Sequence, residues 1–175
     1  MTGTSNFEYW DTCIFLAFLQ NENHRPGELD YIKEQAQKFD LGALTIVTSS
    51  ITVVELLEAR LTADVRSTWK QMIRRSNFQF VEAGQSICEL AALIRNYYKS
   101  NEKFWPTTPD ALHVASAIAA QTSIGIPIRL LTLDSDDKSK DSEKGLTKLN
   151  GKIAGAYDLL ITRPPTQGQQ AHLDL

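Results

Sequence analysis

Residues 7–19 have the sequence FEYWDTCIFLAFL, and this stretch decides the fold that we expect. Its first four residues, 7–10, form a short run rich in aromatic side chains, which is typical of a buried strand. Residues 12–20 are apolar on nearly every side, which predicts a buried helix. Only Asp11 separates the two segments. The stretch therefore predicts a strand that passes directly into a helix, as in the first unit of an α/β domain.

The same alternation continues along the chain. Apolar runs rich in β-branched or aromatic residues predict four further strands, at residues 44–48, 78–81, 128–133 and 158–162. Apolar residues spaced three and four apart predict further helices at residues 29–39, 51–61, 64–75, 85–98 and 108–121. This order predicts a three-layer α/β/α sandwich with a mainly parallel central sheet. We expect one domain over residues 7–163, with a short N-terminal extension at 1–6 and a flexible C-terminal tail at 164–175.

Residues that favour helix starts precede two of the predicted helices. Ser49 or Ser50 would cap the helix at 51–61. Thr108 would cap the helix at 108–121, with Pro109 as its first residue.

Composition limits the class of protein. The 175 residues are 42% apolar and 22% charged, which is ordinary for one soluble globular domain. The net charge of −3 and the sequence pI of 5.6 do not indicate a broad basic surface for nucleic acid. Cys13 and Cys88 are too few for a disulfide framework and have apolar neighbours, so we expect reduced core cysteines and a cytoplasmic protein. No leader-like start and no run of about 18 apolar residues is present, so we expect no signal peptide and no membrane contact.

Acidic residues occur where the predicted strands lead into the next segment. Asp11 follows the first strand, Glu55 lies in the helix after the second, and Asp134 follows the strand at 128–133. Asp110 lies in the first turn of the helix at 108–121. Because functional groups gather at the carboxyl ends of parallel strands, the topology could bring these four residues to one edge of the sheet.

Each acidic residue also has a simpler interpretation. Asp11 could cap a helix, and Asp110 could serve the helix dipole. Asp134 belongs to a run, DSDD, that resembles an exposed turn. Helical spacing does not decide whether Glu55 or Glu58 faces the strand ends.

The surroundings of Asp11 and Asp110 favour a functional interpretation. Asp11 lies between an aromatic strand and an apolar helix, and Asp110 heads the apolar run ALHVASAIAA. Carboxylates are rarely buried among apolar residues unless a cation compensates them. Several converging carboxylates would select a hard divalent ion such as Mg²⁺ or Mn²⁺.

Four segments, in this order, carry a resemblance to a known family: FEYWDTCIFLAFL, SSITVVELLEA, TTPDALHVASAIAA and IRLLTLDSDD. Their order and spacing resemble those of PIN domains (PilT N-terminus), the nuclease fold of VapC-type toxins. The resemblance covers about residues 7–137 and extends to the strand at 158–162.

The resemblance implies roles for individual residues. It places Asp11, Glu55, Asp110 and Asp134 at the acidic metal-binding positions of the family, and it selects Glu55 over Glu58. Thr12 and Thr132 fall at its frequent hydroxyl positions, and Asp136 falls at a secondary acidic position. It also implies a bound Mg²⁺ or Mn²⁺, a homodimer, and silencing by a small antitoxin protein.

These observations predict an endoribonuclease that uses Mg²⁺ or Mn²⁺ to hydrolyse RNA phosphodiester bonds, with Asp11, Asp110 and Asp134 as principal ligands. It could be the toxin of a toxin–antitoxin pair. The alternative is a catalytically weak PIN-fold module that acts through protein or RNA contacts. A phosphatase or receiver domain with Asp11 as nucleophile is less favoured, because a second Asp two residues later is missing.

Basic residues are grouped in one predicted helix. Arg66, Lys70 and Arg74 are four residues apart, and Arg75 is adjacent. This face is either an ordinary solvated surface or a surface for RNA or a second subunit. His113 is interpreted as a packed helix residue rather than a catalyst. Removing the four proposed ligands from the 21 acidic residues leaves 17 against 18 basic ones, so the net charge does not exclude RNA.

Overall fold

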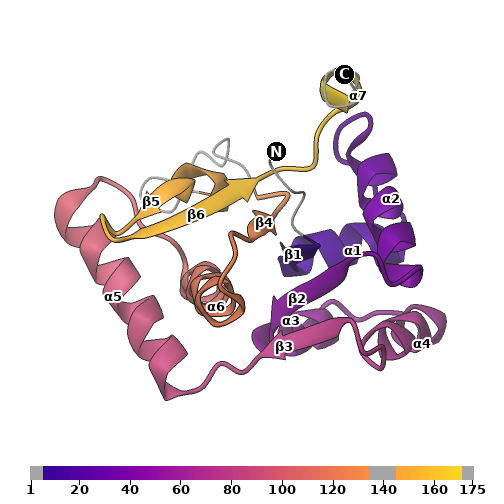
Figure 1. The fold of residues 1–175 in the computed structure, drawn as a ribbon, viewed down its shortest axis with the longest axis horizontal. Coiled ribbons are helices and arrows are strands. Elements are labelled where there is room, and N and C mark those ends of the chain that lie inside the picture. Colours follow the sequence, from indigo (N-terminus) through magenta and orange to yellow (C-terminus); the bar gives the residue numbers. More distant parts are fainter. Residues whose placement is uncertain (1–5, 135–144, 171–175) are drawn as a thin grey trace.

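A central sheet of six strands organises the domain (Figure 1). The structure is a computed structural model that describes residues 6–134 and 145–170. The strand order is β3-β2-β1-β4-β6-β5. The strands are β1 (Phe7–Trp10), β2 (Thr45–Ser49), β3 (Phe78–Val81), β4 (Arg129–Leu131), β5 (Gly151–Ile153) and β6 (Tyr157–Thr162). All neighbouring pairs are parallel except β5 with β6, so the prediction of a mainly parallel sheet is confirmed.

Helices cover both faces of the sheet, which confirms the three-layer α/β/α arrangement (Figure 1). One face carries α5 (Gln85–Asn101) and α6 (Thr108–Ile124). The opposite face carries α1 (Thr12–Gln20), α2 (Glu28–Asp40), α3 (Ile51–Glu58) and α4 (Ala63–Met72). A 3₁₀ turn, η1 (Leu146–Leu149), and the short helix α7 (Gln167–Gln170) complete the described chain. No helix among the described residues has the length and apolar character needed to cross a membrane.

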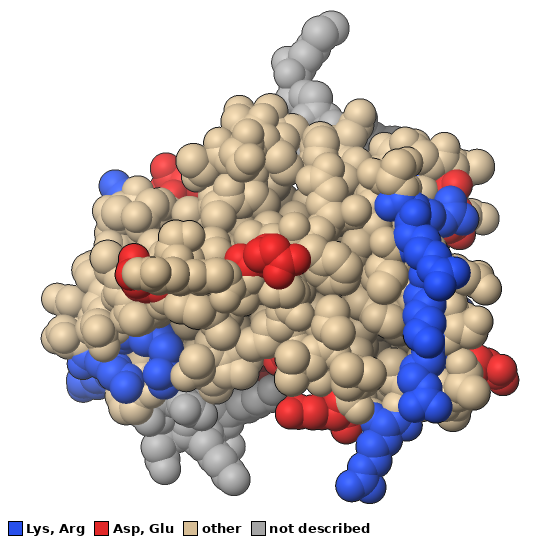
Figure 2. Space-filling model, turned by 90° about the horizontal axis from the view of Figure 1, so that it is seen from below, with Lys and Arg blue, Asp and Glu red and all other residues tan. Residues whose placement is uncertain are grey.

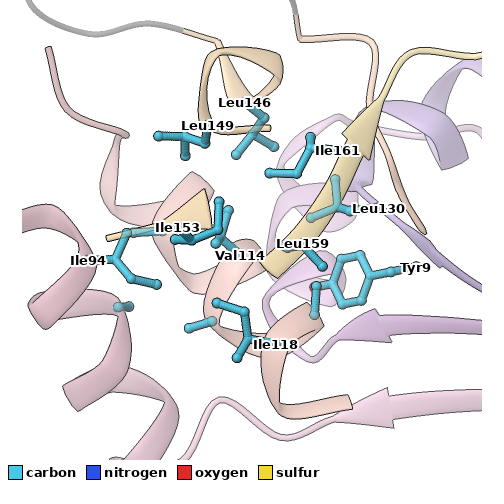
Figure 3. Packing of buried hydrophobic residues seen from close by; sticks show 14 of the residues in the cluster. Tyr9, Ile94, Val114, Ile118, Leu130, Leu146, Leu149, Ile153, Leu159 and Ile161 are labelled. Carbon is cyan, nitrogen blue, oxygen red and sulfur yellow. The ribbon is translucent and has the colours of Figure 1, made fainter. Parts of the chain in front are cut away.

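Strand β1 separates the two halves of the core. Because successive side chains of a strand point to opposite faces, Tyr9 packs with α5 and α6 while Trp10 packs with α1 and α2. On the first face, Val114 and Ile118 of α6 lie between Ile94 of α5 and apolar side chains of the sheet (Figure 3). The second face contains an aromatic cluster in which ring centroids lie 5.1–6.4 Å apart, formed by Trp10, Phe15, Phe18, Phe39, Trp69, Phe78 and Phe80.

Several local predictions differ from the structure. Strand β5 was not predicted, and β4 ends at Leu131, before the predicted end at 133, although the backbone N–H of Thr132 still donates to the carbonyl of Thr162 in β6. Thr107, and not Thr108, caps α6, because its hydroxyl accepts from the backbone N–H of Asp110 and Asp110 in turn bonds back to Thr107. Cys88 was expected in the core and is exposed instead, because it lies on the outer side of α5.

The start of α3 is capped differently from either expectation. Ser50 occupies the cap position, but its hydroxyl accepts from the backbone of Ala83 rather than from its own helix. The hydroxyl of Ser49 makes a long contact of 3.5 Å with the backbone N–H of Ile51. Ser50 therefore joins α3 to the segment after β3.

The chain after β6 packs against the start of α2. Arg163 donates to both carboxylate oxygens of Glu28, at 2.7 and 2.9 Å, and also to the carbonyl of Leu133. Farther on, the backbone N–H of Gln167 donates to the carbonyl of Pro26 at 3.1 Å. Residues 164–170, the described part of the expected tail, thus begin at a buried ion pair and include a helix that contacts the α1–α2 loop.

Candidate active site

The candidate site lies where the strand order reverses. From β1 the chain builds the sheet in one direction through β2 and β3, and β4 later pairs with the other side of β1. In open α/β sheets the crevice at the carboxyl ends of two such strands is the usual place for ligands. Asp11 directly follows β1, and Thr132 directly follows β4. The topology therefore brings two predicted site residues to one point.

Asp11 caps a helix and also contacts the end of β4. Its Oδ1 accepts from the backbone N–H of Thr12 at 2.7 Å, as a cap does. Its Oδ2 accepts from the hydroxyl of Thr132 at 2.7 Å and from the thiol of Cys13 at 3.0 Å. Only 10% of the side chain is exposed. The interpretation of Asp11 as a helix cap is thus correct for one oxygen, while the second oxygen faces the end of the neighbouring strand β4.

Cys13 and Thr132 fix the segment that carries Asp134. The thiol sulfur of Cys13 accepts from the backbone N–H of Leu133 at 3.0 Å, and the hydroxyl of Thr132 accepts from that of Asp134 at 3.0 Å. Burial and the charge of Asp11 raise the pKa of Cys13 well above its usual range, so the thiol keeps the proton that it donates to Asp11. Asp134 also accepts from the backbone of Leu146 at 3.2 Å.

Glu55 reaches the site from α3. Its Oε2 accepts from the hydroxyl of Thr12 and lies 2.9 Å from Nε2 of His113. Burial raises the pKa of Glu55, but the hydrogen bonds from His113 and Thr12 outweigh it and lower that pKa overall. The side chain is 28% exposed and so also meets solvent. The structure places Glu55 in the site, while Glu58 on the same helix is exposed.

Asp110 reaches the site from a third element, because it lies in the first turn of α6. Its Oδ2 accepts from the hydroxyl of Thr107 at 2.6 Å and from the Thr107 backbone at 3.3 Å. Burial raises the pKa of Asp110 to about 6, and the charges of Asp11 and Asp134 add to this increase although the Thr107 hydrogen bonds oppose it. Asp11 and Asp134 are therefore close enough for their charges to act on Asp110.

Sequence reasoning interpreted both Cys13 and His113 as core residues, but Cys13 is half-buried and bonds to Asp11, and His113 belongs to this site as well. His113 lies one helical turn after Asp110 and contacts Asp11, Thr12, Glu55 and Tyr9. Burial lowers its pKa, but the neighbouring carboxylates Asp11 and Glu55 outweigh burial and raise it. The spacing of three from Asp110 places both residues on one side of α6, and this spacing is the signal that could have pointed to His113.

Comparison with known proteins identifies the family of this chain. The family profile of the PIN domain matches residues 9–141. The chain belongs to the PIN domain family. A chain in the crystal structure of VapBC2 from Rickettsia felis bound to a DNA fragment from their promoter is similar to this PIN domain, with a TM-score of 0.59 and 14% identity. The similarity covers 90% of this chain and 98% of that chain, and it supports the fold.

A chain of a toxin-antitoxin complex from Klebsiella pneumoniae is 21% identical, with a TM-score of 0.46. That comparison covers 75% of this PIN domain and 90% of that chain. No curated protein sequence matches this PIN domain.

The site of this PIN domain has the donor chemistry of a divalent-cation site. Carboxylate oxygens are the ligands that Mg²⁺ and Mn²⁺ prefer, and a cation would compensate the charge of Asp110, whose pKa is raised by burial first and by the charges of Asp11 and Asp134 in addition. The residues present therefore fit such an ion by charge and ligand type. Within residues 6–134 and 145–170, however, no three acidic, His or Cys side chains are already arranged to hold one. Asp136, the secondary candidate, lies outside the described residues.

The predicted basic group divides into two parts. Arg66 and Lys70 on α4 and Arg74 in the turn after it are exposed, and over the described chain none of the three forms an ion pair. Figure 2 shows Lys and Arg side chains in a row along the flank where Figure 1 places α4. Arg75 instead bonds to the carboxylate of Asp40 at 3.0 Å and lies over the ring of Phe39. Arg75 thus has a structural partner, and Arg66, Lys70 and Arg74 are the members of the predicted group that form no ion pair with the described residues.

Proposed function

We propose that this PIN domain is an endoribonuclease that depends on Mg²⁺ or Mn²⁺. The observation that carries the proposal is the convergence of carboxylates at the carboxyl ends of β1 and β4: the charges of Asp11 and Asp134 add to the effect of burial, which is the larger cause of the raised pKa of Asp110. Asp11, Asp110 and Asp134 would hold the ion, and Glu55 would ligate it directly or through water. When bound, such an ion lowers the pKa of a coordinated water and stabilises the charge that develops on the phosphate oxygens.

The residues of the chain itself prepare this site. The hydroxyl of Thr132 donates to the carboxylate of Asp11 and accepts from the backbone N–H of Asp134, so it fixes the position of Asp134 relative to Asp11. The hydroxyl of Thr12 holds Glu55 beside the end of β1. Glu55, Asp110 and Asp134 are each partly exposed whereas Asp11 is buried, so these three carboxylates lie on the side of the site that solvent can reach.

Arg66, Lys70 and Arg74 would bind the phosphates of the RNA. Side chains four residues apart on a helix are separated by about 6 Å along its axis, so they present a row of positive charge to an extended backbone. Exposed cations without carboxylate partners interact with phosphates at little cost of desolvation. The alternative use of this surface, contact with a second subunit, would leave RNA binding unchanged when these residues are reversed in charge.

The direct test is Mg²⁺-dependent cleavage of labelled single-stranded RNA. We expect the natural protein to cut the RNA, and Asp11→Asn and Asp110→Asn to lose this activity while remaining folded. Glu55→Gln should weaken cleavage, and Glu58→Gln, its matched control on the same helix, should not. Full cleavage by both Asp variants would overturn the proposed site.

We further propose that the protein is the cytoplasmic toxin of a toxin–antitoxin pair and forms a homodimer. Support comes from the PIN family membership and from a fold similar to a chain of the VapBC2 structure. Expression of the natural protein should then arrest growth, and a small protein encoded beside it should relieve the arrest. Growth at the normal rate during expression of an RNA-cleaving protein would contradict the toxin role.

A second candidate is a binding module with little catalytic activity. It is favoured by one observation: Glu55 is already bonded to His113 and Thr12, and the described residues hold no ready-made cluster of three ligands. RNA binding without cleavage in either Mg²⁺ or Mn²⁺ would favour this candidate.

A further inference from the structure

His113 is an unusual residue for its position. It lies in the alanine-rich helix α6, between apolar residues that pack into the core, and its side chain is only 1% exposed. A buried imidazole needs a hydrogen-bond partner for each ring nitrogen, because an unpartnered buried polar group destabilises the fold. Both ring nitrogens have such partners here: Tyr9 on β1, Asp11 directly after β1, and Glu55 on α3.

One side of the ring contacts β1. The hydroxyl of Tyr9 lies 2.9 Å from Nδ1, and the two rings meet edge to face with centroids 5.9 Å apart. Tyr9 is fully buried, so this contact cannot be exchanged for water. When the phenol donates to Nδ1, the proton of a neutral imidazole must reside on Nε2.

The other side of the ring contacts the acidic site. Nε2 lies 2.9 Å from Oε2 of Glu55 and 3.3 Å from Oδ1 of Asp11. Carboxylate oxygens only accept hydrogen bonds, so Nε2 carries a proton and donates it towards them. A single N–H group thus draws together a carboxylate from α3 and one from the end of β1.

We propose that His113 is a positioning residue for the metal ligands, with Tyr9 fixing the orientation of its ring. This inference rests on the proposed metal site and adds a residue that the acidic positions alone do not include. His113 does not bind the ion; it holds Glu55 beside Asp11, and the Thr12 hydroxyl supports the same carboxylate. Residues that orient metal ligands in this way commonly change metal affinity by about 10- to 100-fold when they are removed.

The test compares three variants by Mn²⁺ titration calorimetry without RNA. His113→Leu keeps the approximate volume but has no donor, and we expect its affinity for Mn²⁺ to fall by about 10-fold or more. His113→Gln keeps an N–H group at a similar reach and should recover most of the affinity. Tyr9→Phe removes only the phenol oxygen and should give an intermediate loss.

Thermal unfolding separates positioning from packing. If His113 only fills the core, His113→Leu will keep the natural Mn²⁺ affinity whatever its melting temperature, and that result overturns the proposal. A lower affinity in a variant that melts at the natural temperature, together with recovery in His113→Gln, supports it.

A metal-free measurement keeps this inference separate from the proposed function. Long-range ¹H–¹⁵N NMR of the imidazole should show a proton on Nε2, and Glu55→Gln should shift that Nε2 resonance. Failure of the natural protein to bind Mn²⁺ would overturn the metal site, and the NMR result would still decide the His113–Glu55 contact. An Nε2 resonance that Glu55→Gln leaves unchanged would overturn the inference.

Discussion

Replacing Asp110 by Asn should stabilise the metal-free protein at neutral pH while it removes activity. Burial raises the pKa of Asp110 from 3.8 to about 6, and the charges of Asp11 and Asp134 contribute to that rise. Because the pKa of Asp110 is higher in the folded protein than in the unfolded chain, protonation of Asp110 favours the folded state, and this stabilisation has its full size below about pH 4. It is lost as the pH rises through about 6. Above that pH the folded protein carries an unfavourable charge at a partly buried position.

The pKa difference gives the size of the effect. One pKa unit corresponds to about 1.4 kcal/mol, so the shift corresponds to at most about 3 kcal/mol at pH 7.5. Asn is neutral at every pH and keeps a side-chain oxygen that can accept from Thr107, as Asp110 does. The variant and the natural protein should therefore have similar stability at pH 4 and differ by about 2–3 kcal/mol at pH 7.5.

Urea unfolding in EDTA at pH 4 and pH 7.5 measures this difference. Asp30→Asn, at an exposed position of α2, is the matched control for the loss of one negative charge. The account is refuted if Asp110→Asn is no more stable than the natural protein at pH 7.5. A gain of the same size at both pH values would also refute it, because the raised pKa would then not be the cause.

Three further predictions concern a buried ion pair, a close backbone contact and the pH dependence of Mn²⁺ binding. Arg163→Ala should lower the free energy of unfolding by about 3–5 kcal/mol, because it leaves the buried carboxylate of Glu28 without its partner. In urea unfolding, adding Glu28→Gln to this variant should restore part of the lost stability. An unchanged stability of Arg163→Ala would contradict this prediction. Gly27→Ala should lower the melting temperature more than Gly42→Ala. Both glycines have positive φ, but a Cβ at Gly27 would lie 2.5 Å from the backbone of Gln167, whereas a Cβ at Gly42 would meet no atom within 4 Å. An equal decrease in melting temperature for the two variants would show that the close approach has no cost. Calorimetry should show weaker Mn²⁺ binding at pH 5.5 than at pH 7.5. The pKa of Asp110 is about 6, so at the lower pH a proton competes with the ion for this carboxylate. Equal affinities at the two pH values would count against Asp110 as a ligand.

The layers of the fold were predictable because long apolar segments repeat with a clear period. The strand and helix at residues 7–20 have no competing interpretation, and each later strand that joins the parallel part of the sheet is itself a dense apolar run. Strand β5 has only three residues, of which two are exposed, so it shows no alternation that a sequence pattern could detect. It forms through its pairing with β6, which is a tertiary effect.

The start of α6 shows why caps are harder to predict than helices. Two adjacent threonines, Thr107 and Thr108, both favour a cap position. The reciprocal bonds between Thr107 and Asp110 select the first of them. A cap residue followed three residues later by an acidic residue is a known sequence signature of a helix start, so Thr107 could have been predicted as the cap.

The places of Asp11 and Asp134 after strands were predictable and the family resemblance indicated the hydroxyls of Thr12 and Thr132, whereas the contacts of His113 were not predictable. Asp11 and Asp134 follow neighbouring strands, and the family resemblance selected Glu55, which the structure places beside Thr12. His113 looked like a core residue because its neighbours along α6 are apolar. Its partners Tyr9 and Glu55 are 104 and 58 residues away in the sequence, so local periodicity carries no information about them.

The most direct test of the central claim is an anomalous difference map from crystals of the protein grown with Mn²⁺. The account predicts a peak at the carboxyl ends of β1 and β4, with oxygens of Asp11, Asp110 and Asp134 as its protein ligands or bonded to its waters. It also predicts that the peak disappears in Asp11→Asn. A saturated Mn²⁺ soak with no peak at these carboxylates, or with a peak only at another place on the surface, would contradict the account.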